Sequence, residues 1–438
     1  MSTSDDVRTT EAPLTLGEAP PPTLGLRDTF GLWANLGVSL LLPVAAVFVV
    51  LPGRPLSETL TAIVVGAVIG SVLLGLVAAA GARERVPGMV LLRGLLGRRT
   101  SWLPTAFNLV QCVGWATFEI VIIAEAASRV LDAPRWPFVL AAGVLATAMA
   151  LRPLGVVRVL ARYAIWAALA AVVYLYVQVL AEPLPPLESG GATSFWTATD
   201  IVIALPVSWL PLAADYTRHA RSARSAGVGA GVGYGLATVA MFTLGVLALA
   251  AYGSGGLDVI DALLAVPLGA LAVLVLVSVE LDEAFANVYS TAVSAQNVVG
   301  RLDRRVLAVA VGGVATALAL TLDVVAYEPF LFLIGAVFVP LAGVLLVAYW
   351  LTPRGDWDTS DTARARPLHL LPWGAGFVAY QLTLPTYFPG PGSGWTAWWG
   401  ARQADLGIDP ANGWSASLVG LGVAVALTLP VALAGRRR

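Results

Sequence analysis

The segment "IALPVSWLPLAADYTRHA", residues 203–220, is a hydrophobic run interrupted by Pro206 and Pro211. Proline removes a backbone donor and clashes with the preceding turn, so a helix through this segment is expected to break. Unpaired backbone groups at membrane depth persist only where protein or a water-filled cavity satisfies them. The segment therefore predicts a membrane-spanning helix that comes apart to expose its own main chain to a ligand.

The composition of the whole chain is that of a membrane protein. Of its 438 residues, 58% are hydrophobic and 12% are charged, whereas soluble domains carry about 25% charged residues. A hydrocarbon core about 30 Å thick requires roughly 20 apolar residues per helix, and about twelve such segments can be placed. These spans are predicted to begin near Thr29, Glu58, Trp102, Pro137, Arg158, Phe195, Ala226, Leu264, Arg305, Glu328, Leu368 and Trp414. The chain is thus predicted to be an all-α polytopic membrane protein.

The arginines determine the predicted orientation. If the amino terminus is cytoplasmic, the cytoplasmic segments hold 22 of the 26 arginines and the opposite side holds 4, which are Arg54, Arg129, Arg135 and Arg402. This distribution follows the positive-inside rule. Both termini are therefore predicted to be cytoplasmic, in a bacterial inner (plasma) membrane.

Four segments are predicted along the chain. Residues 1–26 are polar, acidic and rich in proline, with no apolar stretch of the kind found in a cleavable signal, and predict a disordered cytoplasmic tail. Spans 1–5 occupy residues 27–182 and spans 6–10 occupy residues 183–352. Residues 353–438 contain spans 11 and 12 and a cytoplasmic carboxyl terminus.

The break in span 6 has a counterpart in span 1. In residues 28–46, "DTFGLWANLGVSLLLPVAA", Gly37-Val38-Ser39 is followed by Pro43, and in span 6 Pro206-Val207-Ser208 is followed by Pro211. A repeat of this kind five spans later indicates two halves of opposite orientation. Two facing breaks would offer half-helix amino ends to a substrate and free carbonyls to a small cation. The alternative is that both segments are simple kinks.

Span 3 contains a carboxylate at membrane depth. Gly114-Trp115 and Glu119 lie near its middle, and Trp115 and Glu119 are four residues apart, so they share one helix face. An intramembrane carboxylate indicates a functional site, although a structural glutamate paired with an interior donor is the alternative. An indole beside a hydrogen-bonding group suits a flat heteroaromatic ligand.

Span 8 is the most acidic predicted span. Glu280, Asp282 and Glu283 fall within four residues of the segment "VLVSVELDEAFANVYSTAVSAQN", residues 275–297. Three carboxylates so close cannot all remain ionised alone, so at least one is expected to hold a proton or a cation. This predicts a coupling-ion site. If the acids instead lay in an outer vestibule, Leu264–Val279 would have to span alone, for which it is too short.

Other functions find little support in the sequence. Cys112 is the only cysteine and lies in an apolar span, which excludes a disulfide framework and a cysteine-based metal site. HExxH, GxSxG and paired metal-ligand motifs are absent from the sequence, so a membrane-embedded enzyme is disfavoured. A channel and an amino-acid or amine symporter are further alternatives. No cofactor and no nucleic-acid partner is expected, and the protein is expected to be monomeric.

Several of these motifs resemble the nucleobase:cation symporter-1 family, the permeases for cytosine, purines, allantoin, hydantoins and related rings. They are "TFGLWANLGVSLLLP" (residues 29–43), "GARERVPGMVLLRGLLGRRTSWLPT" (81–105), Gly114-Trp115 and "DYTRHAR" (215–221), and the resemblance extends over about residues 24–350. The segments "GWATFE", "VSWLPLAADYTR" and "LDEAFANVYSTAVS" are further similar to a bacterial branch linked to hydroxymethylpyrimidine.

The resemblance implies a five-plus-five inverted repeat of the leucine-transporter (LeuT) type with two additional helices. It implies a ligand between spans 1, 3, 6 and 8, with sodium or a proton co-transported. By position, Trp115 would stack on the ring, Glu119 would replace a family glutamine that bonds the ring edge, and Asn287 would be the amide of span 8. The expected substrate-binding residues are Gly37, Ser39, Gly114, Trp115, Glu119, Ser208, Trp209 and Asn287. The expected cation-binding residues are Leu36, Ser39, Ser278, Asp282 and Glu283, with Na⁺ possible at the contact of spans 1 and 8.

Two departures from the family pattern bear on these expectations. Trp209 precedes Asp215 by six residues, whereas the stacking aromatic of relatives precedes it by about nine. Where sodium-dependent relatives have a Ser-Thr pair, this chain has Leu281-Asp282, which leaves both Na⁺ and H⁺ as candidates. The resulting prediction is a secondary active transporter that imports a planar nucleobase-like heterocycle, such as cytosine, hydroxymethylpyrimidine or a related ring, across the lipid bilayer.

Overall fold

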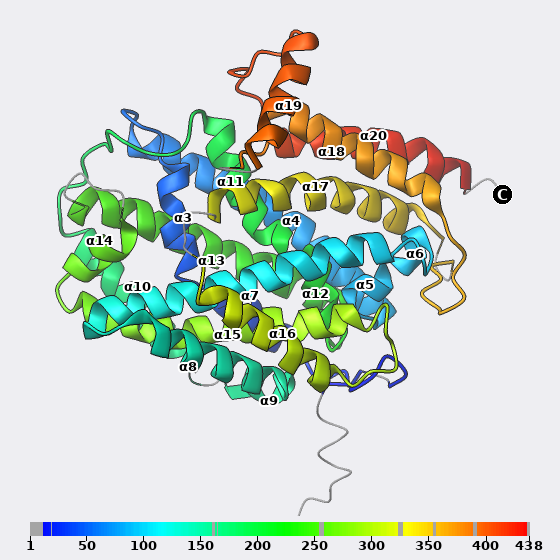
Figure 1. Cartoon of the computed structure of the whole chain (residues 1–438), viewed down its shortest axis with the longest axis horizontal. Coiled ribbons are helices and arrows are strands. Elements are labelled where there is room, and N and C mark those ends of the chain that lie inside the picture. Colours follow the sequence, from blue (N-terminus) through cyan, green and yellow to red (C-terminus); the bar gives the residue numbers. More distant parts are fainter. Residues whose placement is uncertain are drawn as a thin grey trace, which may run out of the picture.

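The computed structural model describes residues 12–18, 20–159, 163, 165–253, 258–322, 327–353, 356–388 and 392–435. These residues form helices and connecting segments, and the longer helices run close to one common axis, horizontal in Figure 1. The helices are α2 (Leu26–Leu36), α3 (Leu41–Val49), α4 (Leu56–Glu84), α5 (Gly88–Leu91), α6 (Arg93–Leu96), α7 (Trp102–Leu131), α8 (Arg135–Ala150), α9 (Pro153–Val159), α10 (Ile165–Val179), α11 (Phe195–Ser208), α12 (Leu210–Thr217), α13 (Ala223–Tyr252), α14 (Val259–Ala265), α15 (Gly269–Ala295), α16 (Arg304–Ala319), α17 (Tyr327–Leu351), η3 (Pro367–His369), α18 (Leu370–Thr383), α19 (Ser393–Asp405) and α20 (Ala416–Gly435).

Helices long and apolar enough to cross a membrane make this a multi-pass membrane protein. Among the described residues there are six such helices, and a seventh span if the bent pair α2 and α3 is counted as one. The six are α4, α7, α11 with α12, α13, α17 and α20 up to Leu433. Helices α8 and α10 are apolar but shorter, with 16 and 15 residues. The predicted span starts at Trp102 and Phe195 coincide with the first residues of α7 and α11.

The packing of the helices repeats after five predicted spans. Helix α4 packs on α13, α7 on α15, and α8 on α16, and each of these pairs joins equivalent spans of the two predicted halves. The contact of α2 with α13 has its counterpart in that of α11 with α4, and the contact of α7 with α16 has its counterpart in that of α15 with α8. If each span is replaced by its equivalent in the other half, five spans away in the chain, the contacts named above are reproduced.

The last part of the chain forms a layer on one side of this bundle. Helices α18 and α20 pack on each other and on α17, and Figure 1 shows them along its upper edge. Asp200 of α11 joins this layer to the bundle, because its buried carboxylate accepts hydrogen bonds from Ser415 Oγ (2.5 Å) and from the N–H of Ala416 (2.7 Å) at the start of α20. Helix α19 projects from this layer and lies at the top of Figure 1.

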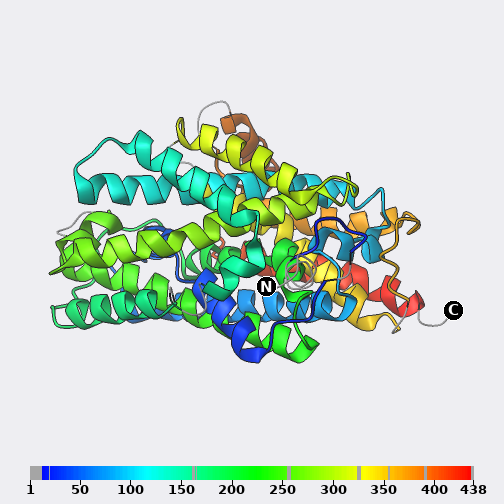
Figure 2. The same cartoon turned by 90° about the horizontal axis from the view of Figure 1, so that it is seen from below.

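Residues 12–24, predicted to belong to a disordered tail, have defined contacts with the bundle. Their dark-blue trace crosses the face seen in Figure 2. Leu24 pairs with Ala220 next to α12, and the fully buried Arg304 of α16 donates to the carbonyls of Pro13 (3.1 Å) and Ala12 (3.4 Å). The physical reason is that a buried guanidinium needs acceptors, and the tail supplies main-chain carbonyls. Residues 1–11 lie outside the described residues.

Candidate functional site

The first predicted break lies between α2 and α3. The helix axis turns by 62° across residues 37–40. Gly37 ends α2, and a Cβ atom there would lie 2.6 Å from Cβ of Ala237, so glycine is required by the close approach of α13. Gly37 therefore positions the break against a neighbouring helix, and its expected role in substrate binding stays a prediction.

Side chains satisfy the main chain at this break. Ser39 Oγ accepts the N–H of Leu41 (3.1 Å) and donates to Glu280 Oε1 (2.8 Å), and the other oxygen of Glu280 accepts the N–H of Leu40 (2.5 Å). The amino end of a helix favours a negative charge, because its first N–H groups have no partner within the helix. Glu280 therefore links α15 to the start of α3 through both of its carboxyl oxygens.

Three glutamates meet beside this link. Glu119 of α7 and Glu280 and Glu283 of α15 each offer an oxygen, and these oxygens lie within 4.8 Å of one another. All three side chains are buried, with at most 3% of any residue exposed. Ionised carboxylates are acceptors only, so this group, the acidic cluster, requires a proton, a metal ion or a donor-bearing cation between its members.

The acidic cluster has a neutral neighbour that sequence reasoning missed. Asn35 of α2 contacts Asp282 of α15 through its side-chain amide, and both residues are buried. Leu36, the last residue of α2, is fully buried next to this contact. Three of the five expected cation-binding residues, Ser39, Asp282 and Glu283, thus lie where the α2–α3 break meets α15, and Leu36 is buried at the end of α2. Asn35 could have been identified from the sequence, because it is a polar residue in an apolar span only two positions before the break at Gly37.

Ser278 lies apart from this group. It is on an exposed position of α15, and its hydroxyl donates to the carbonyl of Leu274 in the preceding turn, at 2.8 Å. Because successive helical residues point about 100° apart, Ser278 and Glu280 cannot face the same neighbour. Its predicted role in cation binding therefore has no structural support.

Aromatic residues of α17 hold Trp115 beside the acidic cluster. The Trp115 ring makes edge contacts with Phe330 (centroids 5.3 Å apart) and Tyr327 (5.8 Å). Gly114 provides the space, since a Cβ atom there would lie 2.8 Å from the Phe330 ring. Trp115 Nε1 and the Tyr327 hydroxyl are buried and have no hydrogen-bond partner among the described residues. The role of α17 could not be predicted, since nothing in the spacing of Tyr327 or Phe330 relates them to span 3.

Span 6 remains continuous in direction across its prolines. Helices α11 and α12 are separated by Trp209 alone and together form one span of 23 residues. Since Pro211 has no N–H, local bonds are rearranged: Leu212 N donates to Trp209 O (3.0 Å), and Gln111 of α7 donates to Ser208 O (2.9 Å). The carbonyl that was expected to be exposed is thus bound by a side chain that sequence reasoning missed.

The expected ligands of spans 6 and 8 have partners within the protein. Trp209 Nε1 donates to the Tyr234 hydroxyl (2.9 Å), and Ser208 Oγ donates to the carbonyl of Leu205 (2.6 Å). Asn287 Nδ2 donates to the carbonyl of Glu283 (3.1 Å) in its own helix.

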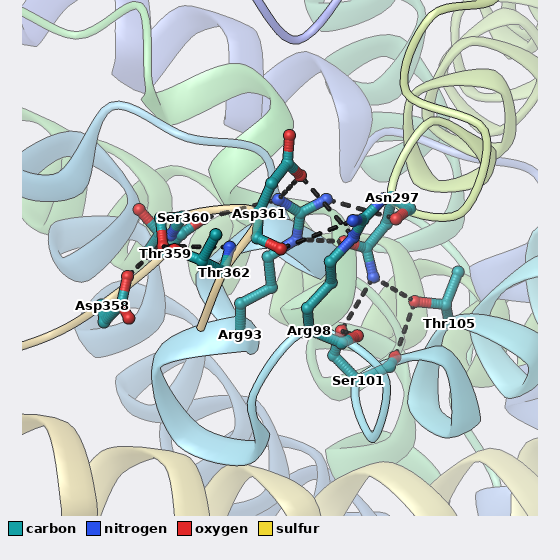
Figure 3. Close-up of polar contacts among 10 residues, drawn as sticks. All are labelled: Arg93, Arg98, Ser101, Thr105, Asn297, Asp358, Thr359, Ser360, Asp361 and Thr362. Atoms are coloured by element: carbon teal, nitrogen blue, oxygen red, sulfur yellow. Dashed lines mark hydrogen bonds and ion pairs between the residues drawn. The ribbon is translucent and has the colours of Figure 1, made fainter. Parts of the chain in front are cut away.

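A second polar network closes the arginine-rich end of the bundle (Figure 3). Arg93, 4% exposed, donates to Asn297 Oδ1 (2.7 Å) at the end of α15 and to Asp361 Oδ1 (2.7 Å) in the segment before η3. Asn297 Nδ2 in turn donates to Ser101 Oγ (3.0 Å) and Thr105 Oγ1 (2.9 Å) at the start of α7. Burial lowers the pKa of the Arg93 guanidinium, and Asp361 opposes this shift. The network ties α6, α7 and α15 together at this end.

Comparison with known proteins gives the site its context. A family profile described as permease for cytosine/purines, uracil, thiamine and allantoin matches residues 23–368. The chain belongs to this family. Its members are transporters, and the protein is accordingly a membrane permease and not an enzyme.

Solved structures show the same fold. Mhp1, a nucleobase-cation-symport-1 family transporter in a closed conformation with bromovinylhydantoin bound, superposes with a TM-score of 0.74 at 16% identity, over 97% of this chain and 95% of Mhp1. The inward-facing conformation of Mhp1 gives a TM-score of 0.68 at 18% identity, over 98% and 93% of the two chains. A manganese transporter of Eremococcus coleocola gives 0.58 at 14% identity, over 97% of this chain and all of the other. No curated protein sequence matches the chain.

Proposed function

We propose that this permease imports a planar nucleobase-like heterocycle by cation symport and alternating access, with cytosine, hydroxymethylpyrimidine and related rings as the candidate substrates. The observation that carries the proposal is the shared face of Trp115 and Glu119 on α7. This face meets the carboxylates of α15 beside the break between α2 and α3. An aromatic ring next to buried polar groups that lack hydrogen-bond partners is the composition expected of a site for a flat polar ring.

The coupling cation, Na⁺ or H⁺, would bind where α2 and α3 meet α15. Support comes from the burial of Ser39, Asp282 and Glu283 at this contact, and from the absence of any ion pair to these acids among the described residues. A cation there would reduce the repulsion among the carboxylates and stabilise the bent span. Substrate and ion would therefore favour the same conformation, which is the basis of coupling.

The transport cycle would use two repeats, residues 27–182 and 183–352, related by inverted symmetry, among about twelve spans of which span 1 is discontinuous. The exchange pattern of helix contacts described above supports this division. The arginine-rich end with Arg93 would face the cytoplasm, together with both termini, in a bacterial inner membrane. The acidic cluster is at most 3% exposed, so one of the repeats must move before a solute can enter.

An amino-acid substrate fits the site less well. Its carboxylate would lie beside Glu119, Glu280 and Glu283, and among the described residues no arginine forms an ion pair with these three. Like charges at such distances repel strongly in a poorly solvated interior. A transporter for amino acids would be expected to supply a positive group for the carboxylate.

Uptake into proteoliposomes tests the proposed function. We expect saturable accumulation of labelled cytosine or hydroxymethylpyrimidine that requires an inward Na⁺ or H⁺ gradient and collapses with the matching ionophore. Trp115→Ala should reduce the apparent affinity by about 5- to 150-fold, since stacking on an aromatic ring contributes on the order of 1–3 kcal/mol.

Trp398→Ala is the matched control, because Trp398 is 56% exposed on α19. Non-saturable flux would indicate a channel. Unchanged affinity in Trp115→Ala would contradict the site assignment.

A further inference from the structure

A cavity of about 890 Å³ lies at the arginine-rich end of the bundle, beside the network of Figure 3. Its walls come from the segment of residues 15–20, the turn that joins α4 to α5, the end of α12, the turn after α15 and residues 359–361. Cavities that bind small organic ligands have volumes of this order, about 300–1,000 Å³. This arginine cavity is lined by five arginines, which are Arg85, Arg93, Arg98, Arg218 and Arg301.

The lining of the arginine cavity carries more positive than negative charge. Its two acids are Glu18 and Asp361. Asp361 pairs with Arg93 (2.7 Å) and Arg98 (3.7 Å), whereas Glu18 accepts hydrogen bonds from its own segment. Among the described residues, the other three arginines of the cavity form no ion pair. Five arginines against two acids leave three positive charges without a partner of opposite sign.

Arg218 is the most informative of these three arginines, because it is only 3% exposed. Its Nε donates to the carbonyl of Asp215 (3.2 Å) and its Nη2 to the Tyr289 hydroxyl (3.0 Å), and its Nη1 has no acceptor among the described residues. The Asp215 carboxylate instead accepts the N–H of Gly88 (2.9 Å) and forms no ion pair with Arg218. A buried charge with neutral partners alone is unfavourable, and an anion in the cavity would compensate it.

The other two unpaired arginines, Arg85 and Arg301, are exposed. Water solvates an exposed guanidinium, and the positive-inside rule accounts for arginines at this end of the bundle. Neither explanation accounts for a buried arginine that opens onto a cavity. Several charges of one sign around a concave site also concentrate ions of the opposite sign there.

We propose that the arginine cavity binds a phosphate-bearing anion, with Arg85, Arg218 and Arg301 as its charged donors. The planar guanidinium forms two parallel hydrogen bonds with phosphate oxygens. A phosphate monoester carries a charge of about −1.5 to −2 at pH 7, which offsets most of the unpaired charge of the lining. The phosphate belongs either to a soluble ester or to a lipid headgroup. This inference goes beyond the proposed function and is independent of the transported solute.

Binding to the full-length protein tests the proposal. Inorganic phosphate and cytidine monophosphate are titrated calorimetrically in a nonionic detergent and a phosphate-free buffer, and phosphatidylglycerol is compared with phosphatidylcholine in nanodiscs by melting temperature. We expect saturable binding of at least one probe, with an affinity that falls as ionic strength rises. Because residues 15–18 form part of the wall, the bound probe should also slow hydrogen exchange over residues 12–18. The absence of saturable binding by all the probes would overturn the proposal.

The double variant Arg85→Gln/Arg301→Gln should weaken the binding of that probe by at least about tenfold, because it removes two charge-assisted donors. Both positions are exposed, so the variant is expected to fold. Arg224→Gln/Arg305→Gln is the matched control: it removes the same charge from exposed positions, and neither residue lines the cavity. Equal loss of binding in both double variants would show non-specific attraction to a basic surface and would overturn the proposal.

The two sources of phosphate give different results. Stabilisation by phosphatidylglycerol that Arg85→Gln/Arg301→Gln loses would assign the cavity to a lipid headgroup. Binding of cytidine monophosphate or inorganic phosphate that is equal in the two lipids would assign it to a soluble phosphate. Uptake of the heterocycle without binding of any phosphate probe would contradict this inference and leave the proposed function intact.

Discussion

At the scale of single residues, the site depends on side chains that satisfy main-chain groups. Ser39 accepts from the start of α3 and donates to Glu280, so one hydroxyl joins the broken span to α15. A serine at the amino end of a helix stabilises it by about 1 kcal/mol, because a free N–H gains an acceptor. In this case the same serine also orients the anion that binds the neighbouring N–H.

Ser39→Ala should therefore lower the stability of the protein by about 1–2 kcal/mol and reduce substrate uptake. Melting temperature in detergent and initial uptake rate in proteoliposomes measure the two effects. Ser278→Ala is the control, because the Ser278 hydroxyl bonds only within its own helix on an exposed face. Equal behaviour of the two variants would show that the link through Ser39 is unimportant.

The sequence allowed the polar residues of the site to be predicted better than their partners. Trp115, Glu119 and Glu283 stand out in the sequence because burying a polar group in an apolar span costs free energy unless the group has a partner or a ligand. The structure places these three residues close together. Trp209 was predicted as a ligand, but its indole donates to Tyr234. Partners on other helices, such as Tyr327, could not be identified, because periodicity within one span says nothing about which span lies opposite.

At the scale of elements, Asp200 shows how the last helices are attached. It is a carboxylate in the middle of an apolar helix, and it caps the amino end of α20 through Ser415 and the N–H of Ala416. A negative charge at this position is favoured by the unpaired N–H groups and by the dipole of α20. The contact fixes the layer of α18 and α20 on the bundle at one buried point.

Asp200→Ala is expected to cost about 1–3 kcal/mol and to loosen α20 without unfolding the bundle. Hydrogen exchange over residues 416–435 should rise, while exchange over α4 and α13 stays near the wild-type level. In the control Asp405→Ala, an exposed ion pair with Arg402 is lost, which contributes at most about 1 kcal/mol. Uniformly faster exchange in Asp200→Ala would point instead to a general loss of stability.

Most helices could be predicted from hydropathy, and the exceptions have physical causes. The break of span 1 was signalled by Gly37 and Pro43, and the axis turns by 62° there. In span 6 the same pattern interrupts the helix at one residue, because Gln111 supplies the donor that Pro211 removes. Helix α19 went unpredicted because its segment is short, rich in glycine and proline at the start, and stabilised by contacts such as Trp399 on Phe377.

At the scale of the whole molecule, residues 12–24 join parts of the bundle that are distant in sequence. One end of this segment binds Arg304 at the start of α16, and the other pairs with the residues that follow α12. His219 Nδ1 lies 3.2 Å from the carbonyl of Pro21, so the ring donates to the segment in its Nδ1–H form. The segment could not be predicted from composition, because buried Arg304 recruits main-chain carbonyls, which every residue has.

The His219 ring makes this attachment sensitive to acid. Burial, reinforced by the charge of Arg218, lowers the pKa of His219 from 6.5 to about 3. Between these two values the unfolded chain binds a proton that the folded chain excludes, so stability falls as the pH decreases, by up to about 1.4 kcal/mol per pH unit. His219→Gln has no such titration. The melting temperature of the wild type should therefore drop relative to that of His219→Gln between pH 6.5 and about 4.5, and parallel curves would contradict the assignment.

The turn at residues 37–40 has a consequence for how the molecule moves. An intact helix is bonded to itself, so changing its direction means sacrificing several bonds at once. Here the main chain is bonded to Ser39 and Glu280 instead, and such bonds can be exchanged singly for bonds to water or solute. The bend thus lies beside the buried carboxyl groups of Glu119, Glu280 and Glu283, and we expect it to act as the hinge of the transport cycle. Neutralising the Glu280 carboxylate would weaken its bonds to Ser39 and to the start of α3, so we expect occupancy of the site to alter the angle between α2 and α3.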